Sequence, residues 1–145
     1  MMSRMSRRCT TTLTPEQRQD DASCPCGSGQ DFADCCGPRL AGDAPAVTAE
    51  QLMRSRYTAF ARGEADYLLA TWHPETRPSR VRLDPAQRWI GLRILHTDAG
   101  GENDESGTVE FVARFKTGGS GYRLQELSRF EKIDGRWYYR DGDHR

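Results

Sequence analysis

The sequence predicts an α+β domain in which two helices pack on one face of an antiparallel sheet of about four strands. Apolar residues recur with helical spacing between residues 48 and 72, and they alternate with polar residues between 89 and 140. A third feature precedes the helices: four of the five cysteines fall within residues 24–36. We therefore expect a small cysteine-rich unit joined to an α+β domain.

Length and composition fit one soluble domain of ordinary size. The chain has 145 residues, of which 36% are hydrophobic and 29% are charged. The formal net charge is zero, which gives no general attraction to nucleic acid or to an anionic membrane. No apolar run approaches membrane-spanning length, so we expect no membrane contact. No signal peptide precedes the cysteines, and we expect a cytoplasmic protein.

Residues 1–23 are polar and arginine-rich, with almost no apolar periodicity. Such a segment cannot bury enough apolar surface to fold, so we expect a disordered tail. Cys9 lies in this segment and is interpreted as an incidental thiol.

The spacing of the other four cysteines indicates a metal site. Cys24 and Cys26 form one short chelating pair, and Cys35 and Cys36 form the other. Two such pairs joined by a loop can supply the four soft ligands of a tetrahedral zinc ion. Small residues at 27–29 let backbone N–H groups turn towards the thiolates. Since the protein fills all four coordination positions, we expect Zn²⁺ in a structural and not a catalytic role.

Disulfides are the main alternative. A bridge within either cysteine pair would be strained because the ring is so short, whereas bridges between the pairs are sterically possible. For the metal site, four thiolates and Zn²⁺ sum to a charge of −2, which Arg39 could offset. Asp31 and Asp34 have the unfavourable sign and are expected to point into solvent, and Phe32 could cover the site.

The sequence CPCGSG followed by CCGP resembles the SEC-C zinc motif, named from the tail of the SecA translocation ATPase. The last ligand of that motif is often His, and Cys36 takes its place here. We assign residues 24–40 to this unit. The resemblance implies contacts with a protein partner, with the SecB chaperone or the ribosome as precedents in the family. A tail that binds the acidic SecB surface should be basic, so Asp31 and Asp34 disfavour SecB.

Residues 41–46 are predicted to be a linker after a chain break at Gly37-Pro38. Thr48, with Gln51 three residues later, predicts a helix start with a capping box, and Gly63 predicts its end. Asp66 is expected to cap a second helix that ends at His73, before Pro74. The expected buried face of the first helix consists of Ala49, Leu52, Met53, Tyr57 and Phe60.

Residues 74–88 contain three prolines and should be irregular. Alternation then predicts four strands, and residues 97–107 are expected to form a loop. Asp134-Gly135 predicts a two-residue hairpin turn. The predicted strands are Trp89–His96, Thr108–Thr117, Tyr122–Ile133 and Arg136–Arg140.

This order of elements resembles the nuclear transport factor 2-like cone, in which a curved sheet wraps around helices. The segments TAEQLMRSRYTAFARGEADYLLATWHPETRP, VEFVARF and SRFEKIDGRWYYRDG resemble the YchJ family of small bacterial proteins. The resemblance extends over residues 24–142. It implies a SEC-C motif joined to a nuclear transport factor 2-like domain, here residues 47–145, but it supplies no reaction.

Three functions are compatible with the sequence. The leading hypothesis is a zinc-binding adaptor or accessory protein, with the motif as its protein-interaction unit and the cone as a scaffold or small-ligand pocket. The second is nucleic-acid or ribosome contact through a basic strip around Trp89. The strip consists of Arg77, Arg80, Arg82, Arg88 and Arg93. A homodimer through the outer sheet face is a further expectation.

The third function is catalysis, because some proteins with this fold are isomerases, dehydratases or hydrolases. If Phe130 faces the helices, Glu126 does too, and Glu126 beside Tyr57 would pair a base with a phenolic donor. His73 is the other candidate proton shuttle. Competing interpretations are an ion pair from Glu126 to Arg54 or Arg56, a bulge that turns Glu126 outward, and a purely structural His73.

Overall fold

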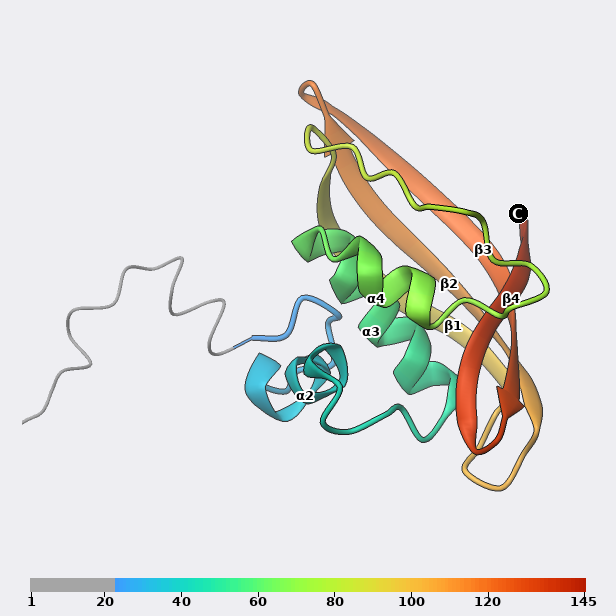
Figure 1. Ribbon diagram of the computed structural model, residues 1–145. Coiled ribbons are helices and arrows are strands. Elements are labelled where there is room, and N and C mark those ends of the chain that lie inside the picture. The colour runs from blue at the N-terminus through green and yellow to red at the C-terminus, as the bar shows by residue number, and fades with distance from the viewer. Residues whose placement is uncertain (1–22) are drawn as a thin grey trace, which may run out of the picture.

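The computed structural model describes residues 23–145. Figure 1 shows the helices lying against one face of a four-stranded antiparallel sheet, with the cysteine motif beside them. The expected tail and Cys9 lie outside the described residues, apart from the exposed Ser23. The elements in chain order are η2 (Phe32–Asp34), α2 (Cys36–Ala41), α3 (Ala49–Arg62), α4 (Ala65–Ala70), β1 (Arg88–Ala99), β2 (Ser106–Thr117), β3 (Ser120–Ile133) and β4 (Arg136–His144).

Helix α3 begins and ends where the sequence predicts. The Thr48 hydroxyl accepts a hydrogen bond from the backbone N–H of Gln51 at 3.1 Å, and Gly63 ends the helix with a φ of 79°. The reciprocal bond of the predicted capping box is shifted by one residue, because the Gln51 side chain accepts from the N–H of Val47 at 2.9 Å. Both bonds satisfy backbone donors that the helix cannot pair internally.

The predictions for the two short helices need correction. Gly37 and Pro38 do not break the chain but lie in the first turn of α2, where proline is tolerated because its missing N–H would have no helical partner. Helix α4 is preceded by Glu64 and not capped by Asp66, which lies in its first turn. It ends at Ala70 and not at His73, because the next residues form backbone hydrogen bonds with Tyr139 of β4.

The sheet is a meander with strand order β1-β2-β3-β4. Asp134 and Gly135, with φ of 52° and 82°, form the predicted two-residue turn. All four strands are longer than predicted: β1 continues to Ala99, β2 begins at Ser106, β3 begins at Ser120 and β4 continues to His144. The polar ends of these strands form backbone pairs with the adjacent strands. A hydrophobic pattern does not reveal such pairing.

The inner face of the sheet carries the core. Val109, Ser128 and Phe130 are at most 1% exposed, and Glu126 shares their buried face, as alternation predicts. The sheet does contain a bulge beside this position. It lies in β4, since Arg129 pairs with Asp141 and Phe130 pairs with Tyr139. Strand β3 therefore stays regular, and the alternative in which a bulge turns Glu126 outward is wrong.

The two edges of the sheet differ. The centre of the β4 edge is covered by the segment after α4, where Thr71 accepts a backbone hydrogen bond from Tyr139 at 2.8 Å and His73 donates one to Tyr139 at 2.7 Å. The β1 edge carries register shifts at Ile90 and Leu95, whose side chains are exposed. Bulges of this kind interrupt the ladder that an edge strand would offer to another strand.

Across residues 23–145, no helix combines the length and the apolar character needed to cross a membrane.

Candidate metal centre and cone cavity

The four predicted ligands, Cys24, Cys26, Cys35 and Cys36, converge. Their sulfur atoms all lie within 4.8 Å of one another, and all four side chains are buried. Sγ of Cys26 lies 3.6 Å from Sγ of Cys35, which is 3.9 Å from Sγ of Cys36. Four sulfurs around a tetrahedral ion with bonds of about 2.3 Å are separated by roughly 3.8 Å. The residues therefore fit a metal ion, and all four thiols are free of disulfide bonds.

The electrostatics of the cluster also favour a cation. Hydrogen bonds from Cys24 and Cys36 hold the pKa of Cys26 well below its ordinary value. The pKa of Cys36 is raised, chiefly by its hydrogen bonds to Cys24 and Cys26, and burial raises the pKa of Cys35. Four buried thiols in contact cannot all ionise unless a positive charge lies between them.

Two arginines lie beside the cluster and bind its backbone. Arg39 donates to the carbonyl oxygen of Cys35, as its predicted position suggests. Arg54 donates from Nη1 to the carbonyl oxygen of Cys26 at 2.8 Å, and its Nε pairs with Glu50 at 2.9 Å. The ion pair between Arg54 and Glu126 that the sequence suggests is not formed. Ser28 contributes a hydroxyl 3.2 Å from Sγ of Cys35.

The cysteine motif packs directly on the cone. Its four cysteines belong to the same apolar cluster as Ala49 and Leu52 of α3. Sγ of Cys24 lies 3.8 Å from the hydroxyl of Thr58 on α3. Phe32 packs against the same cluster, and the Arg62 guanidinium lies 4.5 Å from the centre of its ring. The expected exposure of Asp31 and Asp34 is observed. The motif thus has one buried side and one acidic, exposed side.

A second site lies between α3 and the sheet. It is a cavity of about 240 Å³, smaller than the roughly 300 Å³ at the lower end for drug-sized ligands. Both Glu126 and Tyr57 line it, so the structure brings these two predicted residues to one cavity. Its lining is mostly aromatic and consists of Met53, Arg56, Tyr57, Phe60, Trp72, Trp89, Phe111, Ala113, Leu124, Glu126, Ser128 and Tyr139.

The phenolic hydroxyl that contacts Glu126 belongs to Tyr139 and not to Tyr57. Oε2 of Glu126 accepts from Tyr139 at 2.9 Å and from Ser128 at 2.7 Å. Burial raises the pKa of Tyr139, and it raises that of Tyr57 to about 12, so both phenols stay protonated at neutral pH. Gly142, on β4, makes room for the carboxylate, since a Cβ there would lie 2.6 Å from Cδ of Glu126.

Arg56 is buried in the lining of the cavity and is not the ion-pair partner of Glu126 that the sequence suggests. It forms no ion pair with Glu126 among the described residues; its guanidinium lies 4.6 Å from the ring centre of Tyr139 and 5.1 Å from that of Trp72. The sequence does indicate that Arg56 is buried, because Arg56 occupies position i+7 of the apolar helix face that begins at Ala49. A cation at such a position predicts a buried charge.

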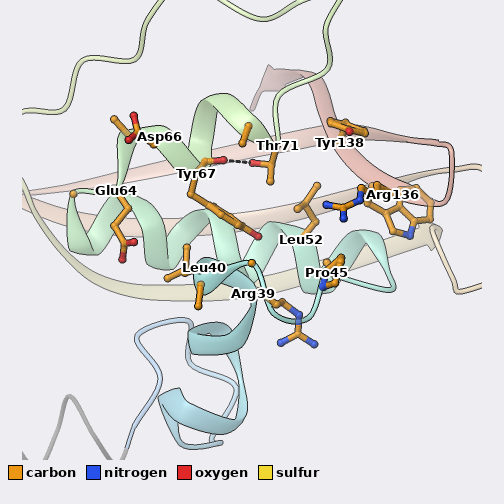
Figure 2. Close-up of a pocket in the computed structure, with 17 residues that line it drawn as sticks. Arg39, Leu40, Pro45, Leu52, Glu64, Asp66, Tyr67, Thr71, Arg136 and Tyr138 are labelled. Atoms are coloured by element: carbon orange, nitrogen blue, oxygen red, sulfur yellow. Dashed lines mark hydrogen bonds between the residues drawn. The ribbon is translucent and has the colours of Figure 1, made fainter.

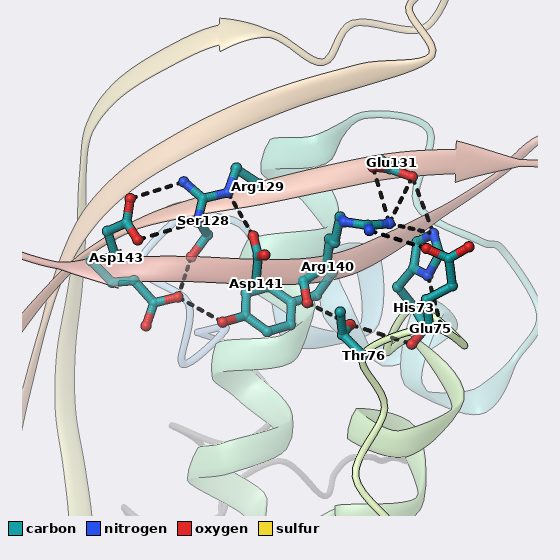
Figure 3. A network of polar contacts seen from close by, with 11 residues as sticks. His73, Glu75, Thr76, Ser128, Arg129, Glu131, Arg140, Asp141 and Asp143 are labelled. Carbon is teal, nitrogen blue, oxygen red and sulfur yellow. Dashed lines mark hydrogen bonds and ion pairs between the residues drawn. The ribbon is translucent and has the colours of Figure 1, made fainter.

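His73 lies outside this cavity. It is buried on the other side of β4, where its Nε2 lies 3.1 Å from Oε1 of Glu131 and 3.2 Å from Nη1 of Arg140 (Figure 3). Its Nδ1 accepts from the backbone N–H of Glu75 at 3.0 Å, which places the proton of the neutral ring on Nε2. Nδ1 is thus bonded within the segment after α4, and Nε2 lies against Glu131 of β3 and Arg140 of β4. These contacts hold the segment to the sheet, which is a structural role.

Figure 2 shows a third hollow, an open groove of about 610 Å³ bordered by α2, α4 and β4. Tyr67 points into it and bonds to Ser55 of α3 across 2.6 Å. None of Glu126, Tyr57 and His73 lines this groove, so the catalytic candidates do not meet there.

The predicted basic strip is exposed. Arg80, Arg82, Arg88 and Arg93 all lie at the surface, and Arg77 donates to the carbonyl oxygen of Trp72 at 2.8 Å. Trp89 is not available for base stacking as the strip hypothesis requires, because it packs on Tyr57, Phe60 and Phe115 in the core. A nucleic-acid role for this strip stays a prediction based on charge alone.

Two family models match this chain. The model for the YchJ middle domain, a nuclear transport factor 2-like domain, matches residues 48–142. The SEC-C motif model matches residues 22–38, which contain all four clustered cysteines. Together they account for both parts of the structure.

Curated relatives extend over nearly the same length. A UPF0225 protein of Chromobacterium violaceum is 55% identical over 130 residues, which cover 87% of this chain and 96% of the relative. A UPF0225 protein of Streptomyces coelicolor is 54% identical over 120 residues, covering 83% and 94%.

Solved structures share the architecture. The solution structure of a SEC-C motif containing protein from Rhodopseudomonas palustris has a TM-score of 0.73 at 40% identity, and it covers 83% of this chain and 96% of that one. A crystal structure of a SEC-C motif containing protein from Psychrobacter arcticus has a TM-score of 0.70 at 29% identity, with coverages of 84% and 82%. The chain therefore belongs to the UPF0225 family, in which a SEC-C motif is joined to a YchJ-type, nuclear transport factor 2-like domain.

Proposed function

We propose that this protein is a zinc-binding accessory protein whose Cys24, Cys26, Cys35 and Cys36 hold a structural zinc ion. The convergence of four buried sulfur atoms within 4.8 Å carries this proposal. Four thiolates in a tetrahedral arrangement favour zinc over hard cations such as magnesium or calcium. The protein fills every coordination position, so no position is left at which the ion could activate water or a substrate.

The ion would stabilise the junction between the motif and the cone. Its ligands pack against Ala49 and Leu52, and Arg54 of α3 binds the backbone at Cys26. Since structural zinc contributes its binding energy to folding, the ion would stabilise α3 as well as the motif itself.

Native mass spectrometry of untagged protein, followed by acid release and elemental analysis, tests the metal. We expect one zinc ion per chain, with the mass raised by that of one zinc ion less two protons relative to the all-thiol form. A metal-free chain that is two or four protons light would mean disulfides and would refute the proposal.

The exposed side of the motif is our proposed contact for a protein partner. Asp31 and Asp34 lie there in solvent, opposite the side that packs on the cone. A partner with a basic surface would complement them, whereas the acidic SecB surface would not. Catalysis at Glu126 and ribosome contact through the basic strip are the alternative functions. No contact among the described residues favours either of them over the protein-partner contact at the motif.

Site-specific photocrosslinking tests the partner contact. A crosslinker at the exposed Ala33 should capture a defined partner, and a crosslinker at the exposed Tyr122, far along the sheet, serves as control. Combined Asp31→Asn and Asp34→Asn substitutions should abolish capture while the zinc content stays at one per chain. Equal capture at both positions would show that the motif is not the contact.

A further inference from the structure

The cone cavity contains one buried cation and one buried anion that do not neutralise each other directly. Arg56 is 3% exposed and Glu126 is 9% exposed, and both line the cavity. Tyr139 stands between them, since its ring lies against the Arg56 guanidinium and its hydroxyl bonds to Glu126. Each charged group therefore retains hydrogen-bonding capacity towards the cavity.

The hydrogen bonds of Arg56 leave most of its donors unused. Its Nη1 donates to the carbonyl oxygen of Leu68 at 2.8 Å and to the hydroxyl of Thr71 at 2.7 Å. A guanidinium has five N–H groups, and those on Nε and Nη2 donate to no acceptor in residues 23–145. Burial lowers the pKa of Arg56 to about 10, which shows how poorly this cation is solvated. An anion in the cavity would relieve that cost.

Two further polar groups of the lining have spare capacity. The indole Nε1 of Trp72 is buried and has no hydrogen-bond partner in the described part of the chain. Oε2 of Glu126 accepts two hydrogen bonds, whereas Oε1 has only the exposed His144 nearby, at 3.8 Å. Among the residues that line the cavity, Arg56 and Trp72 thus have unused donors and Glu126 has one unused acceptor.

We propose that the cone cavity binds a small planar carboxylate that carries a hydroxyl or other hydrogen-bond donor away from its acid group. The carboxylate would accept from Arg56 and Trp72, the donor would bind Oε1 of Glu126, and the planar body would lie against the aromatic walls. The volume of about 240 Å³ limits the ligand to roughly one ring with its substituents. A cationic ligand fits less well, because the free N–H groups of Arg56 would repel it.

This proposal does not depend on the metal or on a protein partner. Its residues lie on α3, the segment after α4 and the sheet, and none belongs to the cysteine motif. Zinc content and ligand binding can therefore be measured separately on the same sample.

The test is an NMR titration of the full-length, zinc-loaded protein, followed at the indole N–H signals of its three tryptophans. The probes are 4-hydroxybenzoate, benzoate and benzylamine. We expect 4-hydroxybenzoate to shift the Trp72 signal and to bind several-fold more tightly than benzoate, and benzylamine to cause no shift. Preference for benzylamine, or no shift with any probe at millimolar concentration, would overturn the proposal.

Two variants identify the binding groups. Arg56→Lys should weaken 4-hydroxybenzoate binding at least tenfold, since the planar array of donors is lost. Glu126→Gln keeps an acceptor for Ser128 and Tyr139, and it should reduce the affinity for 4-hydroxybenzoate to that for benzoate. Arg62→Lys, on the same helix but outside the cavity, is the matched control and should bind normally. If Arg56→Lys does not fold, the Glu126→Gln variant still tests the proposal. If that variant still binds 4-hydroxybenzoate more tightly than benzoate, the assigned role of Glu126 is wrong.

Discussion

Arg54 of α3 donates a hydrogen bond to the carbonyl oxygen of Cys26 across 2.8 Å, and this contact joins the cone to the cysteine motif. Desolvation lowers the pKa of Arg54, but its bonds to Glu50 and to Cys26 outweigh that effect, so the net pKa is raised. The guanidinium thus stays charged beside a cluster that would carry a charge of −2 with zinc. One side chain serves both the packing of the motif and the charge balance of the metal site.

Arg54→Met should weaken metal retention. The substitution leaves the carbonyl oxygen of Cys26 without its donor, at an expected cost of about 1–3 kcal/mol. Zinc transfer to a chromogenic chelator should become faster, and the denaturation midpoint should fall. Glu50→Gln is the control, because it removes only the half-exposed ion pair with Arg54, worth less than about 1 kcal/mol. Equal effects of both variants would assign the role to the ion pair instead.

Metal removal should destabilise the cone and not only the motif. The cysteines share an apolar cluster with Ala49, Leu52 and Met53 of α3. An ion present at about 1,000 times its Kd stabilises the folded state by roughly 4 kcal/mol. Hydrogen exchange of the apo protein should therefore show faster exchange at α3 amides, with recovery after zinc is restored. Unchanged protection of α3 would mean that the motif is an independent unit, as a simple adaptor model requires.

Gly142→Ala should disturb the Glu126 site. An added Cβ would lie 2.6 Å from Cδ and 2.8 Å from Cγ of Glu126, so the carboxylate must move away from Ser128 and Tyr139. Overpacking of this kind costs about 1–3 kcal/mol, which urea denaturation can measure. Gly121→Ala, in β3, is the control, since nothing lies within 4 Å of the position of its Cβ. If the Gly142→Ala variant is as stable as the control, the Glu126 carboxylate can move to another position without loss of stability.

Thr48→Ala should lower the free energy of unfolding by about 1 kcal/mol, because the N–H of Gln51 loses its acceptor at the start of α3. Thr48→Ser retains the hydroxyl and should behave like the unsubstituted protein in the same urea titration. If both variants are equally destabilised, the methyl group of Thr48 and not its hydroxyl is the important part.

The fold was largely predictable because its signals are local. The cap at Thr48, the end at Gly63 and the turn at Asp134-Gly135 are each specified by residues next to one another in the chain. The positions of strand ends and of the end of α4 were not, because they depend on backbone pairing with distant segments. The pairing of Tyr139 with Thr71 and His73 is an example, since 66 to 68 positions separate the partners.

The candidate sites were also predictable only where local sequence specifies them. The convergence of the four cysteines follows from spacing within one short loop. At the cavity, alternation correctly placed Glu126 inward, but it could not identify Tyr139 as its partner. That partner is set by the one-residue bulge in β4, which alters the register opposite Phe130. Arg56 was detectable as a cation on an apolar face, yet its contacts with Trp72 and Tyr139 are tertiary.

The unequal edges of the sheet restrict how copies of this protein could assemble. A strand added at β4 would meet the segment that already pairs with Tyr139, whereas β1 has an outer edge that pairs with no other strand among the described residues. Two copies joined through β1 would use up that edge in a closed, two-fold pair. Growth into longer stacks would then require displacing the segment at β4, and the bulges at Ile90 and Leu95 already interrupt the ladder that β1 offers.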